Sequence, residues 1–190
     1  MIDPITLIEL TNLKASGQLE ELAAHPQLGM KPEWIEELYA DENPLVCETL
    51  AQNPALASCP DVVEKLSTDK VPEVREALAE NPALSSFPET IEKLSRDTDD
   101  RVRSCLALNP ALANFPEILD QLCNDHDLAV RQYLAYNPAL ANFPEILDRL
   151  SRDEDPWVRD ALARNPAIPT HAASANSWQA TQRAITTPTI

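Results

Sequence analysis

Apolar residues in this chain recur at helical spacing within short segments that begin at a proline. Residues 137–164 show the pattern in two segments, PEILDRLS and PWVRDALAR. The apolar side chains fall on one helical face in each segment: Ile146, Leu147 and Leu150 in the first, Val158 and Leu162 in the second. Because proline fits the first turn of a helix and this spacing is typical of amphipathic helices, the pattern predicts two short helices.

The flanking residues indicate where these helices begin and end. Asn142, followed three residues later by Glu145, predicts a capping box for the first helix, and Asp155 predicts the cap of the second. Asn165 is expected to end the second helix, since a residue that precedes proline is pushed out of the helical region. Such short helices are unstable alone, so stacking on neighbouring helices must supply the stability.

The same pattern returns every 28 residues along the chain, and the phrase NPALANFPEILD occurs twice, word for word. Self-similarity at such a period is typical of proteins built from stacked repeats. The sequence therefore predicts one all-α domain, an α-solenoid of two-helix repeats. The expected parts are an N-terminal capping repeat 1–24, full repeats 25–52, 53–80, 81–108, 109–136 and 137–164, a C-terminal capping helix 165–184 and a tail 185–190.

The repeats NPALANFPEILDRLSRDEDPWVRDALAR and NPALASCPDVVEKLSTDKVPEVREALAE resemble the leucine-rich repeat variant family. Their second half, an Asp followed six residues later by an Arg after Val, is also similar to HEAT repeats. The resemblance covers residues 1–164 and implies a right-handed superhelix of alternating short helices, one of them 3₁₀-like. Some relatives carry an N-terminal cysteine cluster for an iron–sulfur centre. No cysteine precedes Cys47 here, so we expect no cofactor.

The charge balance narrows the class of partner. The chain has 15 Lys and Arg against 31 Asp and Glu, a net charge of −16. Nonspecific binding to nucleic acid or to an anionic membrane needs positive charge, so neither partner is expected. The four cysteines have no C-x-x-C spacing, no apolar run is long enough to span a bilayer, and the acidic N-terminus does not predict a signal peptide. We therefore expect a cytoplasmic protein with free thiols.

No catalytic constellation is evident in the sequence. The three histidines, His25, His126 and His171, occupy different positions of the repeat, and a stack would hold them far apart. There is no glycine-rich phosphate loop and no G-x-S-x-G or H-E-x-x-H motif. We expect no catalytic residue and no metal ligand, and hence a protein that is not an enzyme.

Two columns of the repeat hold an aspartate and an arginine: Asp69 and Arg75, Asp97 and Arg103, Asp125 and Arg131, Asp153 and Arg159. Four arginines in a row could bind an acidic partner. Alternatively, each arginine pairs with an aspartate of its own or the next repeat and fixes the turn between the helices. Because Leu13 and Leu19 replace both charges in the first repeat, we favour this structural ladder.

One group of variable positions predicts a binding surface. Leu108 and Tyr136 share a column in adjacent repeats, Cys105 and Tyr133 lie one turn before them, and Trp157 begins the next second helix. Rigid aromatic side chains beside an apolar neighbour are common anchors of interfaces. The competing interpretation is that the tyrosines pack beneath the following Asn-Pro turn.

The sequence thus predicts a repeat scaffold that binds another protein through a helix-lined surface. An acidic mimic that inhibits a nucleic-acid-binding protein is the first alternative and would need a continuous acidic face. A HEAT-like protein that processes nucleic acid is the second, and the net charge disfavours it.

Overall fold

All regular secondary structure in the described part of the chain is helical. The computed structural model describes residues 4–41 and 43–168, and within these ranges it has α-helices and 3₁₀ helices but no strand. The all-α prediction is confirmed. Most of the expected C-terminal capping helix, 165–184, and the tail, 185–190, lie outside the described residues.

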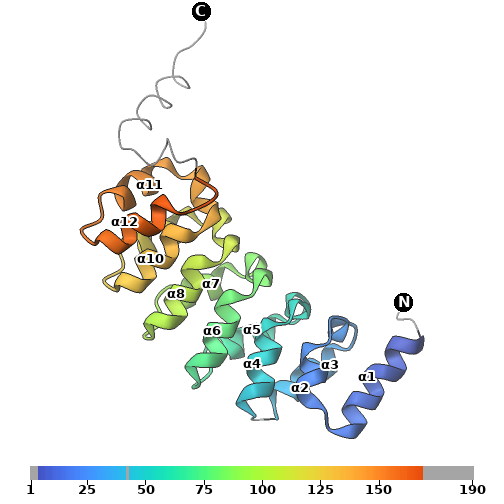
Figure 1. Cartoon of the computed structure of the whole chain (residues 1–190). Helices are drawn as coiled ribbons and strands as arrows, with labels where there is room; N and C mark the ends of the chain where they lie inside the picture. The colour runs from blue at the N-terminus through green and yellow to red at the C-terminus, as the bar shows by residue number, and fades with distance from the viewer. Residues whose placement is uncertain (1–3, 42, 169–190) are drawn as a thin grey trace, which may run out of the picture.

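The helices follow one another in chain order along an elongated body (Figure 1). The first two repeats contain α1 (Pro4–Ser16), α2 (Leu19–Ala24), the 3₁₀ helix η1 (Leu28–Met30), α3 (Pro32–Tyr39) and α4 (Pro44–Gln52). The next two contain η2 (Pro54–Ser58), α5 (Pro60–Leu66), α6 (Pro72–Glu80), η3 (Pro82–Ser86), α7 (Pro88–Leu94) and α8 (Asp100–Leu108). The last two contain η4 (Pro110–Asn114), α9 (Pro116–Cys123), α10 (Leu128–Tyr136), η5 (Pro138–Asn142), α11 (Pro144–Ser151) and α12 (Pro156–Ala163).

Each full repeat therefore has three helical elements, and the prediction of two was incomplete. A 3₁₀ helix forms from the Pro-Ala-Leu segment that follows the repeated asparagine, or from Leu28–Met30 in repeat 25–52, and two α-helices complete the repeat. The sequence pattern missed the 3₁₀ helix because a single short turn buries one leucine, such as Leu112 in η4, and has no periodicity of its own.

The capping box predicted for α11 is wrong. Asn142 is exposed and ends η5, and the residue before α11 is Phe143, which has no side-chain capping bond. A residue before proline favours extended backbone, and Phe143, at φ −125° and ψ 73°, uses that position to pack its ring against the core. The cap predicted for α12 is present, since Asp155 accepts a hydrogen bond from the backbone N–H of Trp157 at 2.8 Å.

A column of buried asparagines joins each repeat to the one before it. In Asn109, Nδ2 donates to the carbonyl oxygens of Ala79 (2.7 Å) and Asn81 (3.1 Å), and Oδ1 accepts from the N–H of Ala111 (2.9 Å). The same three bonds recur at every member of the column: Asn53, Asn81, Asn109, Asn137 and Asn165. Only an amide side chain supplies both donors and an acceptor at such a site.

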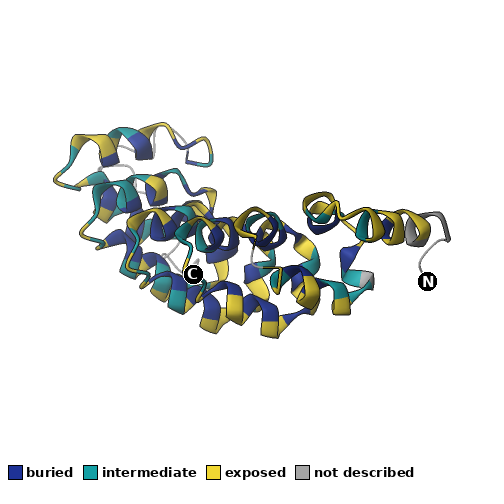
Figure 2. Ribbon diagram, turned by 90° about the horizontal axis from the view of Figure 1, so that it is seen from below, coloured by how far each residue is buried: buried dark blue, intermediate teal, exposed yellow. Residues whose placement is uncertain are grey.

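The second α-helices of the repeats, α4, α6, α8, α10 and α12, pack side by side with their neighbours. The core lies between them and the first helices, where leucines of both are almost fully buried, as Leu94 and Leu106 are. Figure 2 shows buried residues on the helix sides that face neighbouring helices and exposed residues on the outside. The second helices therefore present one continuous outer face, which we call the second-helix face.

Candidate protein-interaction surface

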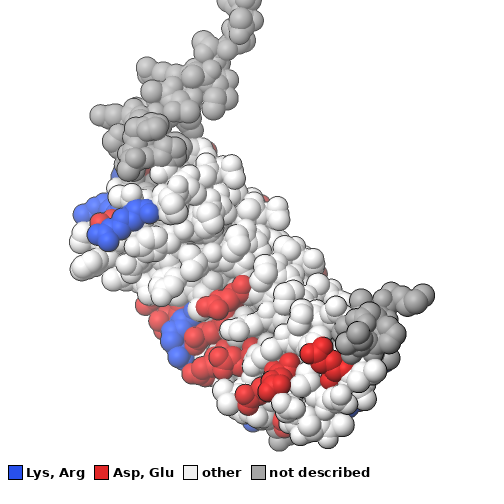
Figure 3. Space-filling model, turned by 45° about the vertical axis from the view of Figure 1, so that its right-hand side comes forward, with Lys and Arg blue, Asp and Glu red and all other residues white. Residues whose placement is uncertain are grey.

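The second-helix face is acidic over its N-terminal half. Glu73, Glu76 and Glu80 lie on the outer side of α6, and Glu48 lies on that of α4. Figure 3 shows acidic side chains gathered toward the N-terminal end of the molecule, with fewer charges toward the other end of that view. This half of the face suits basic groups on a partner.

Arg101 on α8 marks the end of the acidic half. Its guanidinium lies within 3.1–3.4 Å of carboxylate oxygens of Glu73, Glu76 and Asp99. The pKa of Glu76 is nevertheless raised, because its partial burial and the neighbouring carboxylates outweigh the effect of Arg101. One arginine therefore leaves this cluster with an excess of negative charge.

The C-terminal half of the same face carries three exposed apolar side chains. Leu108 on α8 is 41% exposed, Tyr133 on α10 is 44% exposed and Trp157 on α12 is 62% exposed. In the register of the repeat, Trp157, Tyr133 and Leu108 occupy positions i, i+4 and i+7, which share one side of a helix. We call these three side chains the apolar patch.

The apolar patch crosses three adjacent helices as a diagonal. Neighbouring helix axes lie about 8–10 Å apart, and three or four residues advance about 5 Å along a helix. Successive side chains of the patch are therefore spaced by about 10 Å. This spacing fits an extended contact with another chain better than a small-molecule site.

Cys105 and Tyr136, the two other predicted members of this surface, are half-buried and pack against the core. The Cys105 Sγ donates to Glu80 Oε1 at 3.5 Å, and burial together with the charge of Glu80 raises the pKa of the thiol to about 12. Cys105 is therefore a neutral thiol near pH 7 and a poor nucleophile. It lies at the border between the acidic half and the apolar patch.

Tyr136→Ala is expected to lower the free energy of unfolding by about 1–2 kcal/mol, because a half-buried ring gives up part of its core contacts. Tyr133→Ala, one helical turn earlier and more exposed, is expected to change it by less than about 0.5 kcal/mol. Urea unfolding of both variants measures the difference. Equal stabilities of Tyr136→Ala and the unmodified protein would place Tyr136 in the exposed patch instead.

The arginine and aspartate columns form ion pairs that run from each repeat to the next. Each guanidinium binds both oxygens of the aspartate 22 residues ahead, at N···O distances of 2.7–3.2 Å: Arg75 with Asp97, Arg103 with Asp125, and Arg131 with Asp153. Its third nitrogen donates to the carbonyl of the aspartate six residues behind. These side chains are largely buried between the repeats, so they are poorly placed to bind a partner.

This direction of pairing corrects the argument drawn from the first repeat. Each arginine pairs with the aspartate 22 residues ahead, so by register the position of Leu19 pairs with Asp41 and the position of Cys47 pairs with Asp69. Leu13 and Leu19 therefore do not occupy the two positions of one pair. Asp69 instead faces a cysteine where the later aspartates face an arginine. At the other end, Arg159 is exposed and donates to the carbonyls of Asp153 and Glu154.

The remaining reactive side chains do not converge. In residues 4–41 and 43–168, no three His, Cys, Asp or Glu side chains are arranged to hold a metal ion. Within the same ranges the four cysteines are free thiols, and burial raises the pKa of Cys123 to about 11. His25 lies near Glu9 and His126 near Asp125, in different repeats, and His171 lies outside the described residues.

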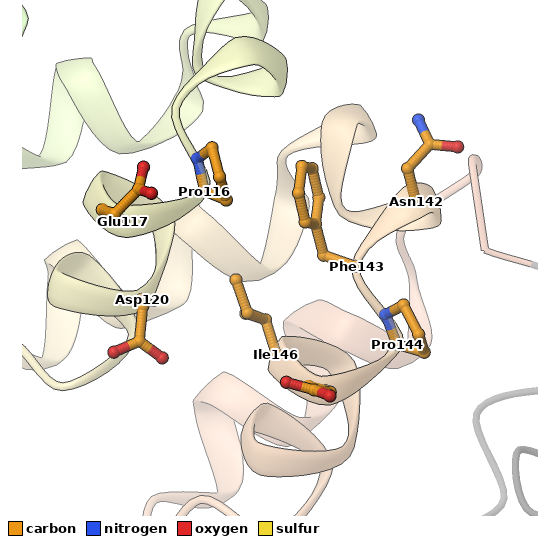
Figure 4. Close-up of a pocket in the computed structure, with 8 residues that line it drawn as sticks. Pro116, Glu117, Asp120, Asn142, Phe143, Pro144 and Ile146 are labelled. Atoms are coloured by element: carbon orange, nitrogen blue, oxygen red, sulfur yellow. The ribbon is translucent and has the colours of Figure 1, made fainter.

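A separate cavity of about 480 Å³ lies between the first helices α9 and α11. Figure 4 shows Phe143 and Ile146 on one side of it and Pro116, Glu117 and Asp120 on the other. Its polar side chains are exposed, and Asp120 already pairs with Arg149 at 2.7 Å. The cavity thus has no buried polar group that would select a ligand, and we rank it below the second-helix face.

No protein-family model matches the sequence, and a search of curated proteins finds no significant match. The family resemblance therefore rests on the repeat pattern itself. In the part of the chain that the structure describes, no helix is both long enough and apolar enough to cross a bilayer.

Proposed function

We propose that this protein is a non-enzymatic α-solenoid that binds another protein through its second-helix face. The 28-residue recurrence of the helices supports a solenoid of the right-handed type that the leucine-rich repeat variant and HEAT families form. In such arrays each repeat contacts its neighbours, and the variable outer positions are free to meet a partner.

The observation that carries this proposal is the apolar patch of Leu108, Tyr133 and Trp157. Five large apolar side chains in the described residues are exposed, and these three lie along one diagonal on the neighbouring second helices α8, α10 and α12. Tyrosine and tryptophan are enriched among the residues that contribute most to binding energy. The acidic half of the same face then favours a partner that has basic side chains beside its apolar contact.

Trp157→Ala and Tyr133→Ala are each expected to weaken binding of the partner by about 2 kcal/mol or more, with the melting temperature nearly unchanged. The matched control is Leu45→Ala. Leu45 is 57% exposed and occupies the same repeat position as Trp157, but on α4, away from the patch.

Affinity purification from native lysate, with the unmodified protein and the three variants as baits, compares the proteins that each of the four baits retains. A protein retained by the unmodified chain and by Leu45→Ala, but lost with Trp157→Ala and Tyr133→Ala, supports the patch as the interface. Equal retention by all four baits would contradict it.

An acidic mimic that blocks a nucleic-acid-binding protein is the second candidate, favoured by Glu48, Glu73, Glu76 and Glu80 along two adjacent helices. It predicts that the partner is released by competing DNA or RNA and that binding weakens steeply with salt. The apolar patch, in contrast, predicts binding that survives moderate salt.

We place the protein in the cytoplasm because its four cysteines are free. A role in processing nucleic acid itself remains disfavoured by the net charge of −16.

A further inference from the structure

The ion pairs between repeats define how this fold binds a guanidinium group. In each of three successive repeats, an arginine lies between a carboxylate of the next repeat and a carbonyl oxygen of its own repeat. Arg75 shows the arrangement, with Asp97 as the bidentate acceptor at 2.7 and 2.8 Å and the Asp69 carbonyl as the third acceptor.

One repeat earlier, the acceptor is retained and the arginine is replaced by Cys47. The Asp69 carboxylate accepts the N–H of Val71 at 2.8 Å, the same bond that orients the later aspartates at 2.9 Å. Asp69 is therefore held in the orientation that binds a guanidinium elsewhere. The Cys47 thiol donates instead to the Tyr39 carbonyl at 3.7 Å.

A cavity of about 440 Å³ occupies this place, at the junction of α3, α4 and α6. Tyr39, Cys47, Asp69 and Val74 line it, with Lys70 among the other lining residues. Liquid water occupies about 30 Å³ per molecule, so the cavity has room for a guanidinium and a short alkyl stem. Tyr39 provides an aromatic wall, which suits a planar cation.

The Asp69 carboxylate is the acidic group of this cavity, and it forms no ion pair with the described residues. Burial and the nearby Asp69 raise the pKa of both Cys47 and Tyr39, which leaves these two groups neutral near pH 7. Lys65 lies over the Tyr39 ring at 5.8 Å, and Lys70 lines the cavity. Neither these amines nor any other cationic side chain in the described ranges lies within ion-pair distance of the Asp69 carboxylate.

We propose that the cavity lined by Tyr39, Cys47, Asp69 and Val74 binds a guanidinium group supplied by another molecule, in the position that arginine occupies in later repeats. The ligand is an arginine side chain of a protein or a small guanidino compound. The site lies apart from the apolar patch, so it does not depend on the function proposed above.

Titration of the full chain by NMR tests the site, with agmatine as the small guanidino probe and N-acetyl-arginine-methylamide as the model of an arginine side chain. Butylamine controls for charge without the planar fork. We expect the amide signals of Cys47, Asp69 and Val74 to shift with one or both guanidino probes. Asp69→Asn should weaken that binding at least about tenfold, because it removes a charge-assisted bidentate contact.

The tighter of the two guanidino probes identifies the source of the ligand. Failure of both probes to shift these signals overturns the proposal, and so does an equal affinity of the Asp69→Asn variant. Shifts of the same size with butylamine would show a general response to cations and would also overturn it.

A second variant tests the geometry without any added ligand. Cys47→Arg should supply the missing guanidinium from the chain itself, raise the melting temperature above that of Cys47→Met, and abolish binding of the probes. Methionine controls for bulk at the same position. In the Asp69→Asn background the advantage of arginine over methionine should disappear. A Cys47→Arg protein no more stable than Cys47→Met would contradict the proposal.

Discussion

Asn109→Ala is expected to lower the free energy of unfolding by about 4 kcal/mol. The substitution removes three hydrogen bonds of a residue that is 2% exposed, and it leaves the carbonyls of Ala79 and Asn81 without their side-chain donor. Each lost bond contributes about 1 kcal/mol, and a buried polar group without a partner adds about 1–3 kcal/mol. Urea unfolding followed by circular dichroism measures the loss.

Asn114→Ala is the matched control, since Asn114 is an exposed asparagine five residues later in the same repeat. Its removal should change the stability by less than about 0.5 kcal/mol. Asn109→Asp keeps the shape of the side chain but removes the amide donor, so that a carboxylate would face two carbonyl oxygens. It should be at least as destabilising as alanine near neutral pH and should recover part of the loss in acid, when it becomes protonated. If Asn109→Ala and Asn114→Ala unfold alike, the asparagine column does not join the repeats.

The helical class and the period could be predicted from the sequence because both follow from spacing. The apolar residues of PEILDRLS lie on one helical face, and the 28-residue step repeats that face along the chain. The role of Asn109 could not be predicted in this way. Asn-Pro also terminates a helix, and that simpler explanation accounts for its position without requiring the amide to be buried.

The candidate surface was less predictable than the fold, because exposure depends on packing between repeats. Leu108 and Tyr136 occupy the same column, yet the structure leaves Leu108 exposed and half-buries Tyr136. A column of the repeat identifies which residues occupy equivalent positions. It does not show whether a side chain pairs within its own repeat or with the next one. Arg103 could equally pair with Asp97 or Asp125 on sequence grounds, and the vacant position at Cys47 becomes visible only once Asp125 is known to be the partner.

Arg103→Ala is expected to lower the free energy of unfolding by about 3 kcal/mol near pH 7, because it leaves the Asp125 carboxylate buried without its cation. Both side chains are less than a tenth exposed, and the pair is bidentate, with Nε to Oδ2 at 2.8 Å and Nη2 to Oδ1 at 3.0 Å. Arg159→Ala is the matched control in the same column. Among the described residues Arg159 makes no bidentate carboxylate contact, and its loss should have a much smaller effect.

The effect of Arg103→Ala should also depend on pH. Burial acts to raise the pKa of Asp125, but the hydrogen bonds from Arg103 and from the Asp127 N–H outweigh it and hold the pKa below the ordinary value of about 3.9. A carboxylate whose pKa is lower in the folded state contributes stability that is complete above the unfolded-state pKa and is lost as the pH falls through the folded-state pKa. The stability difference between the unmodified protein and Arg103→Ala should therefore be largest near neutral pH and shrink below about pH 4. Urea unfolding at a series of pH values measures this difference, and a gap that stays constant into strong acid would mean that Arg103 stabilises the fold through its alkyl chain and not through Asp125.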